Sequence, residues 1–189
     1  MSRKVEFIPD SKRVFAEPAD IVAEWRKYAS QVPAQYALGT AQHETDFTLN
    51  EKDTEPSGYV SMGLYQIGVE EMQQTGHANA NPYDLEDITI IMVDLAEARY
   101  KRLLQVARDR ADASVSSSPR GLSSQQVLDL WAYLALAHNQ GLAAAIKTIT
   151  RHGVGWAAYK ARNPQLADMG RYGDDCITGG SKWDPSFGS

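Results

Sequence analysis

Hydrophobic positions recur at the spacing of an α-helix along most of the chain, which predicts a mostly α-helical fold. Pro18 and Pro33 occupy the favoured first position of two helices, expected over about 18–30 and 33–46. The segment over about 83–110 carries the strongest helical period of the chain, which consists of Ile88, Ile91, Met92, Leu95, Leu103 and Val106. The other expected helices cover about 63–75, 124–138, 142–151 and 155–162.

The remaining segments are rich in residues that favour turns. Residues 1–16 are expected to be irregular or extended, and 50–61 to form a loop with a small β-hairpin. Six serines between positions 113 and 124 predict a flexible surface loop. Glycines and an Asp pair near the C-terminus predict mostly coil there. We therefore expect a single domain over 1–189, with a core at about 18–162 and an irregular tail over 163–189.

Composition limits the class of protein. The 189 residues are 43% hydrophobic and 23% charged, as in ordinary globular domains. A formal net charge of −5 argues against nucleic acid as the main partner, because phosphate binding needs a basic surface. The single cysteine, Cys176, excludes an internal disulfide and a four-cysteine zinc site. No apolar run is long enough to span a membrane, so we expect no integral membrane segment.

The first candidate for chemistry is Glu44, at the end of the helix predicted over 33–46. A zinc protease motif would need a second His four residues after His43, but that position is Phe47. Glu44 follows Ala37 and Ala41 at helical spacing, which places it on the apolar face. Burial there would raise the pKa of the carboxyl, as a general acid requires. Position alone favours the alternative, a Glu that points to solvent or pairs with an Arg.

Two further elements carry polar side chains suited to a neutral ligand. In the first, Gly63 permits a tight turn and Gln66 offers both a donor and an acceptor. The second joins two predicted helices and contains His138, Asn139 and Gly141. Taken singly, each element is better explained by packing, by helix capping or by a core histidine.

The order and spacing of these elements resemble the motifs of the soluble lytic transglycosylase family, lysozyme-like enzymes that cleave peptidoglycan. The family's first motif is an acid, a small hydroxyl residue and, two positions later, Phe. The second is Gly-Leu-Met-Gln, and the third is Ala-Tyr-Asn-Ala-Gly. The matching residues are Glu44, Thr45 and Phe47, then Gly63, Leu64 and Gln66, and finally Ala137, Asn139 and Gly141.

The resemblance covers about residues 33–150 and includes a segment, 81–84, similar to the one before the family's long helix. The chain departs from the motifs at Thr45, Tyr65, His138 and Gln140, and the serine-rich loop is an apparent insertion. The family also has a late tyrosine near its catalytic acid. Its counterpart here is either Tyr172 or Tyr159.

The resemblance implies a mostly α, lysozyme-like fold and a single catalytic carboxyl, Glu44. Glu44 would protonate the β-1,4 bond between N-acetylmuramic acid and N-acetylglucosamine and would then act as a base, giving a 1,6-anhydro end. The residues that would bind substrate are Thr45, Gly63, Tyr65, Gln66, His138, Asn139 and Tyr172.

Two alternatives remain open. A hydrolase similar to goose-type lysozymes would need a second carboxylate to place a water molecule. Asp46, Asp53 and Glu55 are available for that role, and Asp53 and Glu55 are the main candidates. The other alternative, from a different class, is a catalytically degenerate wall-binding or virion structural module.

The expected partners are peptidoglycan glycan strands, and no cofactor or metal is implied. The N-terminus has Arg3 and Lys4 but no apolar run after them, so we expect no classical signal peptide. The protein would be made in the cytoplasm and reach the wall by cell lysis, within a virion or through a secretion system. This picture favours a phage lysin or a component of a virion or secretion machine.

Overall fold

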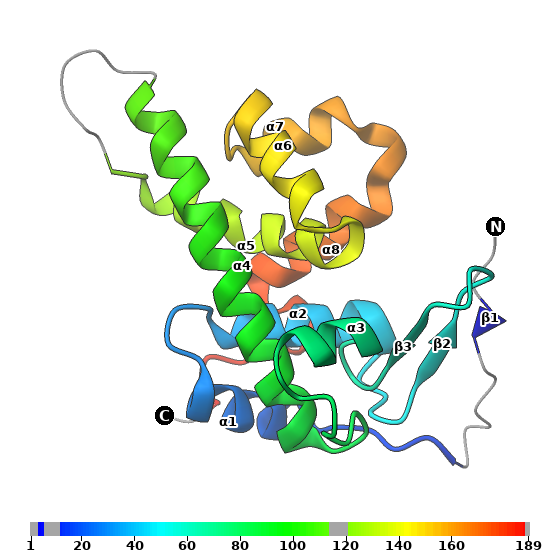
Figure 1. The fold of residues 1–189 in the computed structure, drawn as a ribbon. Coiled ribbons are helices and arrows are strands. Elements are labelled where there is room, and N and C mark those ends of the chain that lie inside the picture. Colours follow the sequence, from blue (N-terminus) through cyan, green and yellow to red (C-terminus); the bar gives the residue numbers. More distant parts are fainter. Residues whose placement is uncertain (1–3, 6–11, 114–120, 188–189) are drawn as a thin grey trace.

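The computed structural model describes residues 4–5, 12–113 and 121–187 (Figure 1). Helices make up most of this part of the chain, which confirms the mostly α class. The α-helices are α1 Pro18–Tyr28, α2 Ala34–Thr45, α3 Val69–Gln74, α4 Leu85–Ala113, α5 Ser124–Gln140, α6 Leu142–His152, α7 Trp156–Arg162 and α8 Ala167–Thr178. Two short 3₁₀ turns cover Pro164–Leu166 and Gly180–Lys182. Most of the serine-rich loop, 114–120, and most of the 1–16 segment lie outside the described residues.

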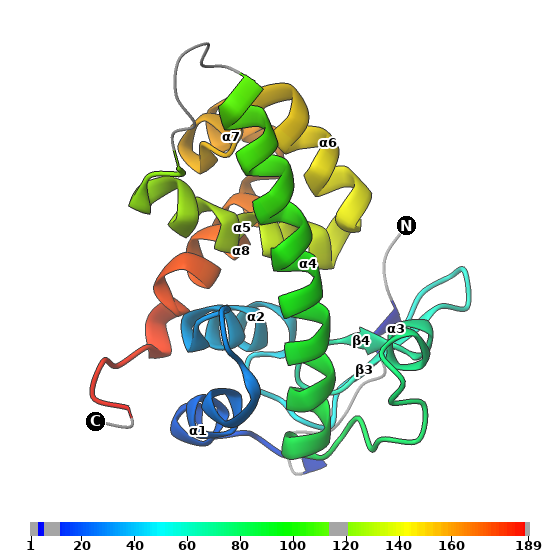
Figure 2. The ribbon, with the colours of Figure 1, turned by 60° about the vertical axis from the view of Figure 1, so that its left-hand side comes forward.

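The long helix α4 connects the two ends of the molecule (Figure 1). Helix α1 packs against α4 and α2, while α5 and α6 pack against α4 further along it. Figure 2 shows the sheet and α3 on one side of α4 and helix α8 on the other. Helix α8 closes the arrangement because it contacts both α2 and α5. The buried apolar residues of these helices form one continuous cluster.

The small antiparallel sheet has the spatial order β1 Lys4–Val5, β2 Lys52–Thr54, β3 Val60–Met62 and β4 Ile67–Gly68, with α1 and α2 between β1 and β2 in the chain. Strands β2 and β3 form the hairpin expected over 50–61, with Asp53 opposite Ser61. The helix expected over 63–75 is wrong in its first half. Gly63 and Gln66 have φ values of 73° and 50°, which cannot continue a right-handed helix, so only Val69–Gln74 is helical.

The prediction of an irregular tail over 163–189 is also wrong. Helix α8 buries Met169, Tyr172 and Cys176 on one face, and these positions are spaced as a helix requires. The glycines serve close packing here. A Cβ at Gly173 would lie 2.1 Å from Cζ2 of Trp156. On the facing helix, a Cβ at Gly39 would lie 2.4 Å from the backbone carbonyl carbon of Asp175.

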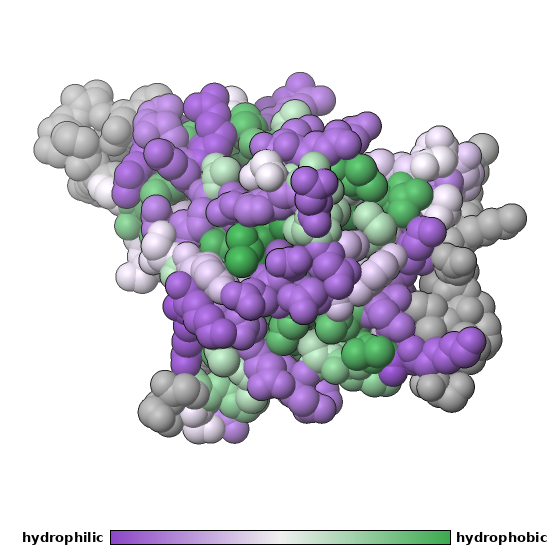
Figure 3. Space-filling view, turned by 60° about the horizontal axis from the view of Figure 1, so that its bottom comes forward, coloured by the Kyte–Doolittle hydropathy of each residue, from purple (hydrophilic) through white to green (hydrophobic). Residues whose placement is uncertain are grey.

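Over the described ranges, we find no helix with the length and apolar character that crossing a bilayer requires. The face in Figure 3 is mostly hydrophilic, with hydrophobic residues scattered among polar ones. Scattered apolar residues of this kind are normal on a protein surface.

We predict that Gly39→Ala destabilises the protein by about 1–3 kcal/mol, because the added methyl group meets the backbone of α8 and the two helices must separate. Gly170→Ala is the matched control within α8. There the methyl group meets only the flexible side chain of Lys160 at 3.3 Å, so stability should change by less than about 1 kcal/mol. Urea unfolding measures both, and equal stabilities of the two variants would contradict the tight crossing of α2 and α8.

Candidate active site

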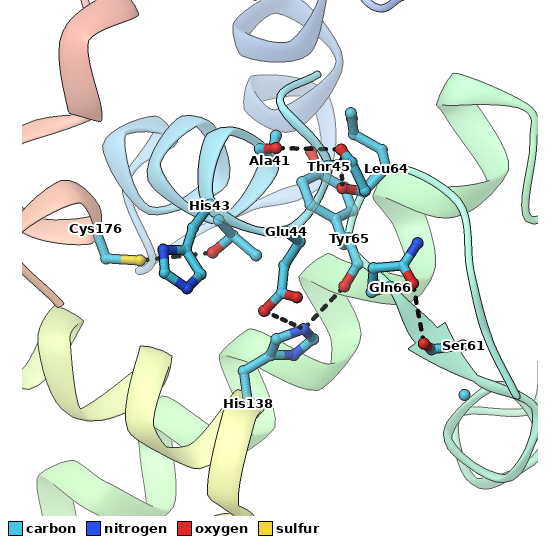
Figure 4. Close-up of polar contacts among 12 residues, drawn as sticks. Ala41, His43, Glu44, Thr45, Ser61, Leu64, Tyr65, Gln66, His138 and Cys176 are labelled. Carbon is cyan, nitrogen blue, oxygen red and sulfur yellow. Dashed lines mark hydrogen bonds and ion pairs between the residues drawn. The ribbon is translucent and has the colours of Figure 1, made fainter. Parts of the chain in front are cut away.

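Glu44 lies in the last turn of α2 and its side chain is only 6% exposed. The helix stops just after it because Asp46 and Phe47 adopt left-handed backbone conformations, with φ values of 47° and 66°. Figure 4 shows the carboxyl pointing away from α2 toward His138, at the end of α5. The neighbouring His43 points to a different side, toward α8, where its ring stacks on Tyr172 with centroids 4.0 Å apart.

His138 of α5 forms an ion-pair contact with Glu44. Its Nε2 atom lies 3.8 Å from Glu44 Oε1 and 2.8 Å from the backbone oxygen of Tyr65. The other ring nitrogen, Nδ1, lies 3.3 Å from Nη1 of Arg99, and only 4% of the His138 side chain is exposed. The carboxyl of Glu44 is therefore shielded from solvent, although its position alone favoured a side chain that points to solvent or pairs with an Arg, and it faces an imidazole.

The turn between β3 and β4 is fixed against the end of α2. The Thr45 hydroxyl donates to the carbonyl oxygens of Ala41, at 3.2 Å, and Leu64, at 3.1 Å. The Gln66 side chain accepts a bond from Ser61 at 3.0 Å and donates one to the Gly63 carbonyl at 3.0 Å. These bonds hold Gln66 in a left-handed backbone conformation that costs a non-glycine residue free energy, a feature often found at functional sites.

These elements surround a polar pocket of about 300 Å³, at the lower end of the size range of ligand pockets. Hydroxyl, amide, imidazole and carboxyl groups dominate its wall. The lining residues are Glu44, Glu55, Tyr59, Ser61, Gln66, Glu71, His138 and Asn139.

Glu71 forms part of this wall and is paired with Arg99. Its Oε2 accepts a bond of 3.1 Å from the backbone N–H of Gly68, the residue just before α3, and its Oε1 accepts a bond from Arg99. Burial raises the pKa of Glu71, but a protonated His138, Arg99 and these hydrogen bonds outweigh it, so its pKa lies below the ordinary value. Glu71 is thus held as a carboxylate by Arg99 of α4 and the Gly68 N–H, and His138 adds to this only when its ring is protonated.

The aromatic side of the pocket comes from the β2–β3 hairpin. Tyr59 is 38% exposed and lines the pocket. Its hydroxyl lies directly over Gly68, where an added Cβ would be only 1.9 Å away. Burial and the charge of Glu71 raise the pKa of Tyr59 to about 12, so the hydroxyl keeps its hydrogen near neutral pH.

The structure brings some of the predicted substrate-binding residues to Glu44 and buries others. Gln66, His138 and Asn139 line the same pocket as Glu44. Thr45 and Gly63 do not: Thr45 clamps the turn, and a Cβ at Gly63 would lie 2.0 Å from the Pro82 oxygen.

The prediction that Tyr65 lines the groove is wrong for its side chain. That side chain is fully buried and packs edge-on against Trp25, with ring centroids 6.4 Å apart. Only the Tyr65 backbone oxygen reaches the site, through its contact with His138.

The two late tyrosines lie in different surroundings. Tyr172 is fully buried in α8 behind Glu44, and burial together with the charge of Glu44 raises its pKa well above the ordinary value. Tyr159 stacks on Trp156, with ring centroids 4.6 Å apart, within α7. Tyr172 is therefore the tyrosine that lies near the candidate acid, although its side chain does not line the pocket.

Of the three candidates for a second carboxylate, only one lines the pocket. Glu55, at the end of β2, lines the pocket with Glu44. Asp53 lies opposite Ser61 on the sheet but is buried and does not line the pocket. Asp46 is exposed at the end of α2.

Sequence reasoning missed Tyr59, Ser61, Glu71 and Arg99. Arg99 had a detectable signal, because it falls between Leu95 and Leu103 in the apolar stripe of α4, where a charged residue needs a buried partner. Glu71 also had one, since it stands three residues after Gly68 at the capping position of α3.

A larger pocket of about 530 Å³ lies on the α8 side of α2, and Glu44 does not line it. Its wall includes Asp168 and Arg171, whose side chains are 73% and 76% exposed. Among the described residues, no three His, Cys, Asp or Glu side chains are arranged to hold a metal ion. The polar pocket at Glu44 is therefore the better candidate for chemistry.

No family model matches the chain, and no curated protein or solved structure matches it significantly. The resemblance to lytic transglycosylases consequently rests on the sequence motifs, and the site geometry has to be judged by its own chemistry.

We predict that Glu71→Gln lowers stability at pH 7 and that the deficit shrinks as the medium becomes acidic. The folded-state pKa of Glu71 is lowered, so its contribution is present above the ordinary pKa of about 4.3 and is lost as pH falls through the folded-state value. Urea unfolding at pH 7, 5 and 3.5 measures the difference, with Glu70→Gln at an exposed neighbouring position as control. A deficit of constant size over this pH range would contradict the assignment.

Proposed function

We propose that this protein is a peptidoglycan glycosidase of the lytic transglycosylase type, with a lysozyme-like arrangement around Glu44 as its general acid and base. The observation that carries the proposal is the place of Glu44: a carboxyl, 6% exposed, in the wall of a pocket otherwise lined by neutral polar groups and two further carboxylates. The segments of the second and third motifs that resemble the family supply two of its other walls, at Gln66 and at Asn139 with its neighbour His138.

The pocket chemistry suits an amide-bearing sugar. Gln66 and Asn139 offer amide donors and acceptors, and Tyr59 offers a partly exposed ring on which a sugar face can pack. The net charge of −5 gives no attraction toward an anionic polymer, so binding would rely on these short-range contacts. We infer that N-acetylated sugar residues of the glycan strand are the substrate.

The proposed reaction uses Glu44 twice. The protonated carboxyl gives its hydrogen to the glycosidic oxygen as the bond from that oxygen to C1 of N-acetylmuramic acid breaks. The C6 hydroxyl of the same sugar then forms a new bond to C1, and its hydrogen passes to the Glu44 carboxylate. The products are a free 4-hydroxyl on one fragment and a 1,6-anhydro end on the other, and Glu44 is restored.

A hydrolase is the second candidate, and one observation favours it: Glu55 lines the same pocket as Glu44. A carboxylate across the pocket can orient a water molecule for attack on C1, in which case the product is a reducing end. Glu71 is less suited to that role because both of its oxygens already accept hydrogen bonds.

We predict that Glu44→Gln lowers the rate of solubilisation of purified sacculi by about 10²–10⁴-fold, because the amide cannot donate the acidic hydrogen. Glu70→Gln is the matched control on the exposed face of α3 and should act at the parental rate. Turbidity loss and a zymogram measure both. Equal clearing by wild type and Glu44→Gln would refute the proposal, and absence of clearing by the folded wild type would favour a wall-binding module.

We further predict that wild-type digests contain 1,6-anhydro ends and that Glu55→Gln changes the rate by less than about 3-fold, because a single carboxyl suffices for intramolecular attack. Mass analysis of released muropeptides reads the product directly. Reducing ends in the digest, together with a loss of activity in Glu55→Gln, would replace the transglycosylase by the hydrolase.

A further inference from the structure

A chain of four side chains leads from Glu44 to Glu71, which lines the same pocket. Glu44 of α2 contacts His138 of α5, His138 contacts Arg99 of α4, and Arg99 contacts Glu71 of α3. In this order, the side chains are 6%, 4%, 13% and 19% exposed. Because four separate helices supply these side chains, their contacts fix the candidate acid relative to the whole wall of the pocket.

The hydrogen-bond partners of His138 determine where its ring carries hydrogen. Arg99 has only donors, so Nδ1, 3.3 Å from Arg99 Nη1, must offer its lone pair. The Tyr65 backbone oxygen is only an acceptor, so Nε2, 2.8 Å away, must carry the hydrogen. The ring is therefore the neutral form with hydrogen on Nε2. Arg99 is held in place by Glu71, whose second oxygen is held by the backbone of Gly68.

This arrangement has a consequence for Glu44, which lies 3.8 Å from Nε2. With hydrogen on Nε2, the ring has no lone pair facing the carboxyl, so it cannot take the acidic hydrogen of Glu44. If Nδ1 also gained a hydrogen, the ring would become a cation beside Glu44 and would hold it as a carboxylate. Arg99 opposes this, because its guanidinium faces Nδ1.

Building on the proposed function, we infer that His138 is a positioning residue for Glu44, and that Arg99 and Glu71 keep its ring in the neutral Nε2–H form so that Glu44 retains its hydrogen for the sugar oxygen. The charged groups around the ring are Glu44 from α2, Arg99 from α4, Glu71 from α3 and Glu55 from the hairpin. Loss of Arg99 would leave the three carboxylates to draw a second hydrogen onto the ring.

The test uses substitutions that separate hydrogen bonding from titration. Gln at position 138 can donate to Tyr65 and accept from Arg99, yet it cannot become a cation, whereas Leu can do neither. We expect His138→Leu to lower kcat by about 10-fold or more with KM changed less than about 3-fold, and His138→Gln to recover most of that loss. Equal losses in the two variants, or a loss in KM alone, would overturn the positioning role.

The role of Arg99 is tested in both backgrounds. We expect Arg99→Met to lower kcat by about 10-fold and to shift the alkaline limb of the pH–rate profile to lower pH, because Glu44 is then a carboxylate over a wider range. In the His138→Gln background the same change should cost less than about 3-fold, since no imidazolium can form. An undiminished loss in that background would show that Arg99 acts by another route. Melting temperatures of all variants identify any that are unfolded.

A spectroscopic measurement keeps the inference separate from the enzymatic proposal. Long-range ¹H–¹⁵N correlation of the ring nitrogens in the folded, labelled protein shows which one carries hydrogen, and His138→Gln assigns the signals. Hydrogen on Nε2 in the wild type supports the inference, and hydrogen on Nδ1 overturns it, whether or not sacculi are cleaved. If wild type and Glu44→Gln are equally inactive while the ring is in the Nε2–H form, the proposed function alone fails.

Discussion

The crossing of α2 and α8 at Gly39 is the constraint on which the candidate site depends. A backbone-to-backbone approach this close leaves no room for a side chain. It therefore fixes the position of α2 along α8 and the rotation of α2 about its own axis. The last turn of α2 then directs Glu44 to the pocket and His43 to α8. A helix end is normally free to fray, but here Thr45 also binds the Leu64 carbonyl, so the acid and the turn that carries Gln66 move as one unit.

The polar chain behind Glu44 explains how charged groups are tolerated at this depth. Arg99 would be costly in the apolar stripe of α4 without Glu71, and Glu71 would be costly without the Gly68 N–H and Arg99. Each of these polar groups provides the hydrogen-bond partner of the next, so the set is stable only when all of its members are present. Both oxygens of Glu71 are occupied by these hydrogen bonds, so Glu44 is the carboxyl of this set that is better placed to give a hydrogen to a ligand.

Much of the helical framework could be predicted from the sequence, because amphipathic spacing, Pro18 and the Ser123 cap are local signals. Helix α8 could not, since its glycines resemble a flexible tail until Trp156 and the backbone of α2 are known to lie beside them. At the site, Glu44, Gln66, His138 and Asn139 were identified from short motifs. The local signals at Glu71 and Arg99 indicate a helix cap and a paired charge, but only the tertiary structure shows that these side chains meet beside Glu44. Tyr59 joins the pocket only through tertiary contacts. Tyr65 was misjudged because a loop aromatic can equally well enter the core.

The contact between Tyr59 and Gly68 bears on how such a groove can change over time. The tyrosine rests on a bare backbone, and any larger side chain at position 68 would lift the hairpin tip that carries it. Substitution at this one position, which is not itself part of the pocket wall, would thus widen the entrance without altering a single group that meets the ligand. Among descendants of this protein that act on bulkier substrates, we therefore expect residue 68 to be the first position at which glycine is replaced by a larger residue.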